Sequence, residues 1–198
     1  MNACFYKSEI SGEVEAVKSK SYLHRAIILA ALSKERVEID GFYPSDDVLA
    51  TVSCVKNLGV KTDIENDKLI VTPCGQPKPN ADYFCGESGT TLRLLLPLVA
   101  GFGVGGKFFT EGNLSERPLK GITDFLNKSG ADVSVNDKVI TVSGKAEYKE
   151  QIEADGTDSS QFVSAALIYA AAFGVKKVFR VGKKVSDRYI SMTAETLK

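Results

Sequence analysis

Three short segments of the chain combine hydroxyl groups, basic side chains and glycine in the way that anion binding requires. They are Ser19-Lys20-Ser21 with Arg25, Gly86-Glu87-Ser88-Gly89-Thr90-Thr91 with Arg93, and Asp158-Ser159-Ser160-Gln161. Each leads into an apolar stretch that predicts a buried helix. A helix N-terminus offers free backbone N–H groups and about half a positive charge, so it readily binds phosphate or carboxylate. Hydroxyls add donors, and glycine allows close approach of the backbone.

Each segment taken singly also has an ordinary explanation. Ser and Thr are common helix caps, Lys20 and Arg25 could form a solvated face, and Gly89 could be only a turn. The single histidine, His24, is expected at the surface or its boundary, without a role. The argument for a site is that the same chemistry occurs three times, before helices at equivalent positions of a repeat. The residues alone therefore predict a pocket for a small molecule that carries several negative charges.

The elements that position these segments follow a repeat of about seventy residues. A serine followed by an acidic residue occurs at Ser45, Ser115 and Ser186, with separations of 70 and 71 residues. Each copy reads strand, helix, strand, helix, strand, strand. The first helices, apolar on nearly every side and hence buried, are predicted at Ser21–Leu32, Thr90–Ala100 and Gln161–Ala172.

The remaining elements recur with the same spacing. Second strands are predicted at Val37–Ile39, Phe108–Thr110 and Val178–Val181. Amphipathic second helices are predicted after the three serines, with Ser45 and Ser115 as N-caps. Hairpins with Asn-Asp turns are predicted at Val60–Thr72 and Asp132–Val142, and the third copy lacks one. The fold class is therefore α+β (α/β), with repeated βαβαββ units around buried helices and an incomplete third repeat.

Composition excludes several classes of protein. The 25 basic and 25 acidic residues balance, which disfavours nucleic acid and an anionic membrane as partners. No apolar run approaches the 18 or so residues of a membrane span. The four cysteines show no Cys-x-x-Cys spacing, and one histidine supplies no metal-ligand set. A metal-free protein of the reducing cytoplasm is expected.

Five motifs together resemble the EPSP synthase (3-phosphoshikimate 1-carboxyvinyltransferase) family, in order and over essentially the whole chain. They are Ser19-Lys20-Ser21 with Arg25, Gly86–Thr91 with Arg93, Glu116-Arg117-Pro118, Ser159-Ser160-Gln161-Phe162, and Ser186 with Tyr189. The resemblance implies transfer of the enolpyruvyl group of phosphoenolpyruvate to the 5-hydroxyl of shikimate 3-phosphate, a step of aromatic amino-acid biosynthesis. Phosphate is released, and no metal or organic cofactor takes part.

The resemblance also implies a domain organisation. The family has two domains with the active site in the cleft between them, and this chain resembles the amino-terminal one. Residues 19–198 would form that domain, in units of about 19–80, 81–148 and 149–198, while residues 1–18 would belong to the other. The family draws an Asp, a Glu and further Lys and Arg residues from the carboxy-terminal domain, whose segments this sequence lacks. The chain is therefore expected to be inactive alone, with shikimate 3-phosphate, phosphoenolpyruvate and that domain as its partners.

Roles carry over motif by motif. Lys20 would be catalytic and contact both substrates, and Gln161 would lie between them. The Gly89 backbone and Arg117 would hold phosphoenolpyruvate, with Arg93 supporting the loop from behind. Shikimate 3-phosphate would be held by Ser21 and Arg25, by Ser159, Ser160 and Ser186 at its phosphate, and by Tyr189 near its ring.

Two positions depart from the family pattern. Glu87 stands where the family usually has Asn, in the loop that receives phosphoenolpyruvate. An inward carboxylate would repel that ligand, so we expect Glu87 to point away. Val17-Lys18 replaces the customary Pro-Gly before the Ser-Lys-Ser motif, which puts the geometry of that approach in doubt.

Two other readings remain open at this point. The UDP-N-acetylglucosamine enolpyruvyl transferases have a similar fold, but they have Lys-Asn at Lys20-Ser21 and a reactive Cys at Gly112. Cys85 is instead expected to be a buried apolar residue. A noncatalytic half-domain that binds phosphorylated metabolites is the alternative from another class, because the acid and base groups are absent.

Overall fold

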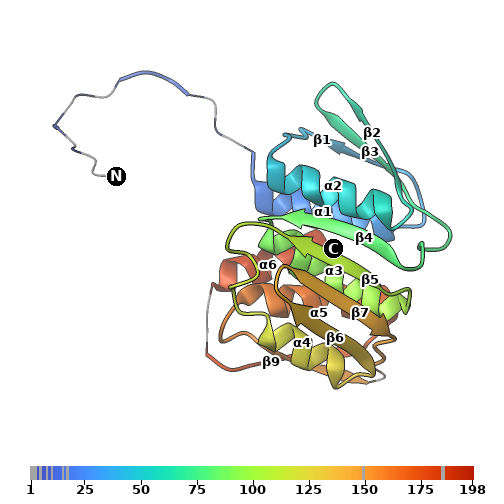
Figure 1. Ribbon diagram of the computed structural model, residues 1–198. Helices are drawn as coiled ribbons and strands as arrows, with labels where there is room; N and C mark the ends of the chain where they lie inside the picture. Colours follow the sequence, from blue (N-terminus) through green and yellow to red (C-terminus); the bar gives the residue numbers. More distant parts are fainter. Residues whose placement is uncertain are drawn as a thin grey trace.

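The computed structural model describes residues 4, 6–7, 9, 11–14, 16, 18–148, 150–183 and 186–198. Helices and strands follow the predicted repeat (Figure 1). In chain order they are α1 (Lys20–Leu32), β1 (Val37–Asp40), α2 (Asp46–Asn57), β2 (Lys61–Glu65), β3 (Lys68–Thr72), β4 (Ala81–Gly86), α3 (Gly89–Phe102), β5 (Gly106–Thr110), α4 (Lys120–Asn127), β6 (Ala131–Asn136), β7 (Val139–Gly144), β8 (Gln151–Asp155), α5 (Ser160–Phe173), β9 (Lys177–Val181) and α6 (Asp187–Thr196).

The strands form three sheets that differ in completeness. The first has the order β1-β3-β2, the second β4-β5-β7-β6, and the third contains only β8 and β9. Both predicted hairpins are confirmed, with left-handed residues at Asn66 and Asp137 that close two-residue turns. The parallel pairs β4–β5 and β8–β9 each enclose a helix in a β-α-β crossover.

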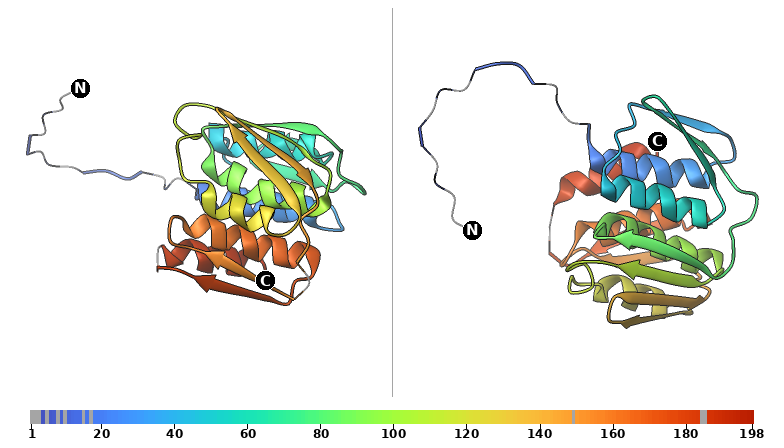
Figure 2. Two further views of the ribbon diagram at one scale, coloured as in Figure 1. Left: turned by 60° about the horizontal axis from the view of Figure 1, so that its bottom comes forward. Right: turned by 45° about the horizontal axis from the view of Figure 1, so that its top comes forward.

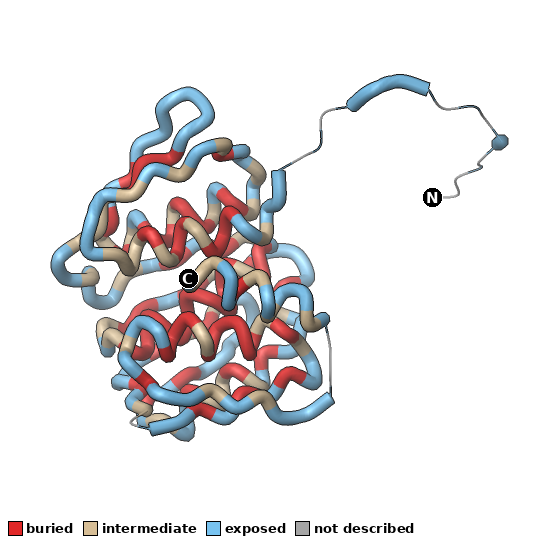
Figure 3. The backbone as a smooth tube through the Cα atoms, turned by 180° about the vertical axis from the view of Figure 1, so that it is seen from behind, coloured by how far each residue is buried: buried red, intermediate tan, exposed pale blue. Residues whose placement is uncertain are grey.

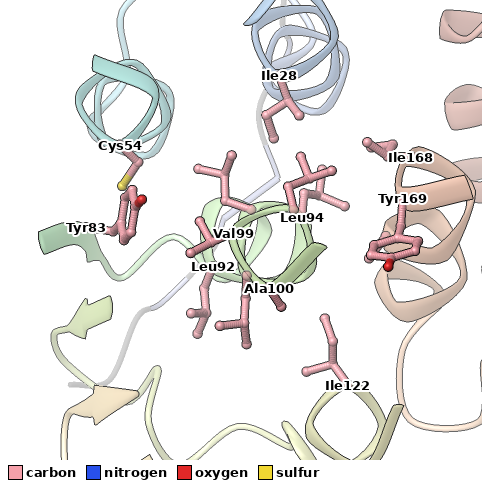
Figure 4. Packing of buried hydrophobic residues seen from close by; sticks show 14 of the residues in the cluster. Ile28, Cys54, Tyr83, Leu92, Leu94, Val99, Ala100, Ile122, Ile168 and Tyr169 are labelled. Atoms are coloured by element: carbon pink, nitrogen blue, oxygen red, sulfur yellow. The ribbon is translucent and has the colours of Figure 1, made fainter. Parts of the chain in front are cut away.

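The first helix of each unit is buried, as predicted from its apolar surface. Helix α3 lies at the centre of the molecule, and Figure 4 shows Ile28 of α1, Ile122 of α4 and Ile168 of α5 around it. Figure 2 shows α1, α3 and α5 between the sheets, and the buried positions concentrate along these helices in Figure 3. Because all three helices share one core, their N-termini are held in fixed relation to one another.

The second helices begin less uniformly than predicted. Ser45 is an N-cap, since its hydroxyl accepts a hydrogen bond from the Val48 amide. Ser115 is not, and that prediction is wrong: α4 begins only at Lys120, after turns that end at Arg117. A residue before proline is disfavoured in the α conformation, which favours a helix that begins after Pro118 rather than one that runs through Arg117.

Candidate functional site

The N-termini of α1, α3 and α5 meet around a cavity of about 350 Å³. Its lining comprises Ser21, Arg25, Thr90, Arg93, Ser159, Ser160, Gln161 and Tyr189. Six of these residues are ones that the motifs assign to the substrates, and they come from segments as far apart as α1 and α6. The tips of the three helices therefore do face a common space.

Hydroxyl groups at these tips divide into caps and free donors. Ser88 and Ser159 act as caps, because their oxygens accept hydrogen bonds from the amides of Thr91 and Gln161. The hydroxyls of Ser21 and Ser160, in contrast, bond to no other residue in the described part of the chain. They remain available to a ligand in the cavity.

Arg25 joins α1 to α5 and α6 from a position that is only 1% exposed. Its Nε donates to Thr193 Oγ1 at 2.7 Å, and its Nη1 donates to the Ser21 carbonyl at 2.8 Å. Longer bonds from Nη2 reach Ser164 Oγ and the Tyr189 carbonyl, each at 3.3 Å. All of these acceptors are neutral, and burial lowers the pKa of the guanidinium.

Arg93 lies near the N-terminus of α3, one position earlier in its helix than Arg25 in α1, and is 6% exposed. Its Nη1 donates to Gln161 Oε1 at 2.9 Å, and its Nη2 donates to the Pro118 carbonyl at 3.2 Å. Its Nε is buried without a partner among the described residues. Burial, and then the charge of Arg117, lower the pKa of Arg93. The side chain thus supports neighbouring elements and also presents its charge to the cavity.

Two cations therefore line one cavity without neutralisation. Within the described ranges, neither Arg25 nor Arg93 forms an ion pair with a carboxylate. An uncompensated buried charge costs several kcal/mol, roughly, and an anion placed between the two guanidinium groups would offset that cost. The site has the electrostatics of a receptor for a polyanion.

Gly89 and Arg117 lie on the α3 side of the cavity. A Cβ atom built on Gly89 would lie 2.6 Å from Arg93 Nη1 and 3.6 Å from Arg117 Nη1. A side chain at this tip would displace the guanidinium of Arg93 and contact that of Arg117, so glycine leaves room for Arg93 in its present position. Gln161 bridges the same region, since its Nε2 donates to Thr90 Oγ1 at 2.9 Å.

Lys20 and Ser186 flank the cavity without lining it. The Nζ of Lys20 lies 2.5 Å from Asp47 Oδ2, and the Asp47 carbonyl accepts a bond from Thr91 at 3.3 Å. Ser186 precedes α6 in a left-handed conformation, and its carbonyl accepts a bond from the Tyr189 amide. Asp47 is a residue that the sequence reasoning missed, because it was visible only as an acidic residue in a helix start. Thr90 was named within the Gly86–Thr91 segment, but without a role of its own.

A comparison with protein-family models matches residues 6–198 to EPSP synthase (3-phosphoshikimate 1-carboxyvinyltransferase). The chain belongs to the EPSP synthase family. The 3-phosphoshikimate 1-carboxyvinyltransferase of Thermococcus kodakarensis is 37% identical over 192 residues, which are 96% of this chain and 46% of that protein. The Clostridium beijerinckii enzyme of the same name is 31% identical, over 100% of this chain and 48% of its own length. This chain spans about half the length of the curated relatives it matches.

Solved structures of the family have the same fold. An EPSP synthase from Acinetobacter baumannii superimposes with a TM-score of 0.72 at 23% identity, covering 88% of this chain and 41% of the other. Among the described residues, no helix is long and apolar enough to cross a membrane. Nor does the described part contain three or more His, Cys, Asp or Glu side chains placed to hold a metal ion.

Glu87, the residue that departs from the family pattern, lies away from the two arginines. Its carboxylate packs over Gly112 and lines a separate depression of about 390 Å³. Asp46, Asp47 and Glu111 line the same depression, so its charge is opposite to that of the arginine-lined cavity. The carboxylate of Glu87 therefore does not oppose an anion bound between Arg25 and Arg93.

Cys85 is fully buried, as expected for a small apolar residue. A hydrogen bond with Cys54, followed by burial, raises the pKa of its thiol. Because the thiolate is the reactive form, this cysteine is not a nucleophile.

His24 contradicts its expected place at the surface, since it is only 1% exposed. Its Nδ1 bonds to Thr51 Oγ1 at 2.6 Å, and this hydroxyl bonds to Thr91 Oγ1, also at 2.6 Å. Thr91 in turn bonds to Ser88 Oγ at 2.6 Å. This chain of buried polar groups joins α1, α2 and α3 near their N-termini, whereas His24 Nε2 is buried with no partner among the described residues.

The same burial predicts a dependence of stability on pH. Desolvation lowers the pKa of His24 to about 4, whereas an unfolded chain has the ordinary value near 6.5. As pH falls through this window the unfolded state takes up a proton first, so stability is lost. The loss should be about 1.5 kcal/mol between pH 6.5 and pH 5. His24→Gln keeps a hydrogen-bond partner for Thr51 but does not titrate. It should remove this dependence of the unfolding free energy on pH, as measured by urea denaturation at several pH values.

Because His24 is the only histidine in the chain, no second imidazole can produce the same slope. Equal slopes in the wild-type protein and in His24→Gln would show that the imidazole is not buried in its neutral form.

Proposed function

We propose that this chain forms half of the active site of a 3-phosphoshikimate 1-carboxyvinyltransferase and binds shikimate 3-phosphate. The observation that carries the proposal is the pair of buried, unneutralised arginines, Arg25 and Arg93, in a cavity lined with hydroxyl groups. Shikimate 3-phosphate bears a carboxylate and a phosphate of about −1.5 to −2 charge, which matches two cations and several donors.

The geometry supports a division of roles among the residues. Ser159 and Ser160 at the tip of α5 would bind the phosphate, together with Ser186 from the start of α6. Ser21 and Arg25 would hold the same substrate from α1, and Tyr189 would lie along its ring. Oriented donors of this kind stabilise a bound anion without reorganisation on binding.

Phosphoenolpyruvate would lie toward Gly89 and Arg117, with Gln161 between the two substrates. Lys20 would contact both, and for this it must exchange Asp47 for a substrate oxygen. A surface ion pair such as Lys20–Asp47 contributes about 0–1 kcal/mol, so it is easily given up. In the free protein Asp47 would hold the lysine side chain in position.

Proton transfer would depend on another part of the enzyme. The addition of the hydroxyl to phosphoenolpyruvate needs an acid for the vinyl carbon and a base for the hydroxyl. No carboxylate of the described residues lines the cavity. We therefore propose that the carboxy-terminal domain supplies these groups, that no cofactor takes part, and that the reaction occurs in the cytoplasm.

A second candidate function follows from the same observation. A cavity with cations but without an acid or base is also what a noncatalytic phosphometabolite-binding half-domain would have. The two candidates share the ligand and differ only in whether a second domain completes the chemistry.

Titration of the ¹⁵N-labelled chain with shikimate 3-phosphate tests the proposed site. We expect saturable shifts at Ser21, Arg25 and Ser159–Gln161 with a dissociation constant in the millimolar range or below, and weaker shifts with inorganic phosphate. No phosphate should be released when phosphoenolpyruvate is added. Absence of shifts at millimolar ligand, or equal shifts with inorganic phosphate, would contradict the assignment.

A further inference from the structure

Two separate networks of buried hydroxyl groups adjoin the cavity. The first, which we call the α3 network, joins α1, α2 and α3 and comprises His24, Thr51, Ser88 and Thr91. The second, the α6 network, joins α1, α5 and α6 and comprises Arg25, Ser164 and Thr193. Each of these side chains is at most 1% exposed. The networks share no side chain, although His24 and Arg25 are consecutive residues of α1.

Thr91 lies at the centre of the α3 network. Its Oγ1 is 2.6 Å from Thr51 Oγ1 and 2.6 Å from Ser88 Oγ. The same atom lies 3.3 Å from the Asp47 carbonyl oxygen, and the Thr91 amide donates to Ser88 Oγ at 3.3 Å. One hydroxyl thus ties the cap of α3 to two residues of α2.

The hydrogen atoms of the α3 network suffice for its short contacts. Three hydroxyls supply three hydrogens, and three contacts of 2.6 Å join them to one another and to His24 Nδ1. Whichever way the bonds run, Thr91 donates to one neighbour and accepts from the other. Buried hydroxyls add little net stability over apolar groups of the same shape, so the main effect of such a network is to fix relative positions.

Thr193 has the corresponding place in the α6 network. It accepts a bond from Arg25 Nε at 2.7 Å, and its Oγ1 lies 2.9 Å from Ser164 Oγ and 2.9 Å from the Tyr189 carbonyl oxygen. Arg25 and Tyr189 both line the cavity. This network therefore supports the side of the cavity that we assign to shikimate 3-phosphate, whereas the α3 network supports the side toward Gly89.

We infer that Thr91 is a positioning residue for phosphoenolpyruvate and that Thr193 is its counterpart for shikimate 3-phosphate. The inference rests on the proposed function, which assigns the two substrates to these two sides. Thr91 would act through Ser88, the cap that precedes Gly89, whose backbone would hold phosphoenolpyruvate. Binding groups must be held within about 0.5 Å of their productive geometry, so the loss of a supporting bond weakens the ligand that those groups hold. Because the networks are separate, each substrate should depend on its own.

Paired substitutions in the full chain test this inference. Thr91→Val and Thr193→Val each remove one hydroxyl and keep the shape of the side chain. Amide shifts are followed by NMR during titration with shikimate 3-phosphate, and then with phosphoenolpyruvate while shikimate 3-phosphate is saturating. Thr91→Val should weaken phosphoenolpyruvate at least tenfold, measured at Gly89 and Arg117, and should leave the affinity for shikimate 3-phosphate within threefold. Thr193→Val should have the reverse effect.

Conservative replacements distinguish positioning by the hydroxyl from packing by the rest of the side chain. Thr91→Ser and Thr193→Ser keep the hydroxyl, so each should bind both substrates within threefold of the wild-type protein. If Thr91→Val does not fold, Thr51→Val removes the adjacent hydroxyl of the same network and leaves the cap of α3 intact. It should then show the same selective loss of phosphoenolpyruvate.

A valine variant that loses both substrates equally would overturn the inference, because the hydroxyl would then have only a structural role. Unchanged affinities would overturn it as well, and so would a wild-type protein in which phosphoenolpyruvate does not shift the Gly89 amide. The proposed function fails on a different result, namely a wild-type protein whose amides do not respond to shikimate 3-phosphate.

Discussion

Phe108→Ala should lower the free energy of unfolding by about 3–5 kcal/mol, which is a large part of the stability of a typical domain. Phe108 is fully buried on the inner face of β5, and its ring stacks on Tyr83 with centroids 4.6 Å apart. Its removal leaves a cavity in the shared core, because close-packed neighbours relax only partially into the space of a deleted ring. Urea denaturation followed by circular dichroism measures the loss.

The neighbouring residue offers a matched control on the same strand. Phe109 points to the outer face of β5 and stacks on Phe84, which is 54% exposed. Phe109→Ala removes the same group but leaves no enclosed cavity, so the cost should be about 1 kcal/mol. Similar losses for the two variants would contradict the assigned faces of the second sheet, and with them the packing that holds the tip of α3.

The architecture could be predicted from the sequence because it depends on local and periodic signals. Apolar spacing marks the helices, and Asn-Asp pairs mark the hairpin turns. The error at Ser115 shows how one residue overrides such a signal: Pro118 delays the helix regardless of the serine before it. A periodic pattern thus predicts which elements exist more reliably than where each begins.

The geometry of the site was predictable only in part. The motifs identified residues at three helix N-termini that meet around one cavity. They meet because equivalent positions of a repeat are related in space. The pairing of Lys20 with Asp47, and of Arg93 with Gln161, joins residues 27 and 68 positions apart. No local pattern shows such contacts. His24 was misplaced for the same reason, because its burial depends on Thr51 of another helix.

Replacing both buried arginines of the cavity should abolish binding of shikimate 3-phosphate, as a consequence of the proposed function. A hydrogen bond to a charged group contributes about 1.5–3 kcal/mol, so Arg25→Gln or Arg93→Gln alone should weaken binding roughly 10- to 100-fold. The double variant should lose about 1000-fold or more. Calorimetric or NMR titration measures the effect, and Arg36→Gln is the control, since Arg36 pairs with Glu38 on the surface.

The unfolding free energies of these variants show whether a loss of affinity comes from the missing charge or from a destabilised fold. Arg25 makes hydrogen bonds that join three helices, whereas Arg93 faces the like charge of Arg117 and leaves its Nε unpaired. Arg93→Gln should therefore cost little stability, and Arg25→Gln should cost more. If Arg93→Gln binds shikimate 3-phosphate within threefold of the wild-type protein while remaining folded, the cavity is not the receptor for the anion. A loss of affinity in a variant of unchanged stability would instead mean that the uncompensated charge of Arg93 is retained for the ligand.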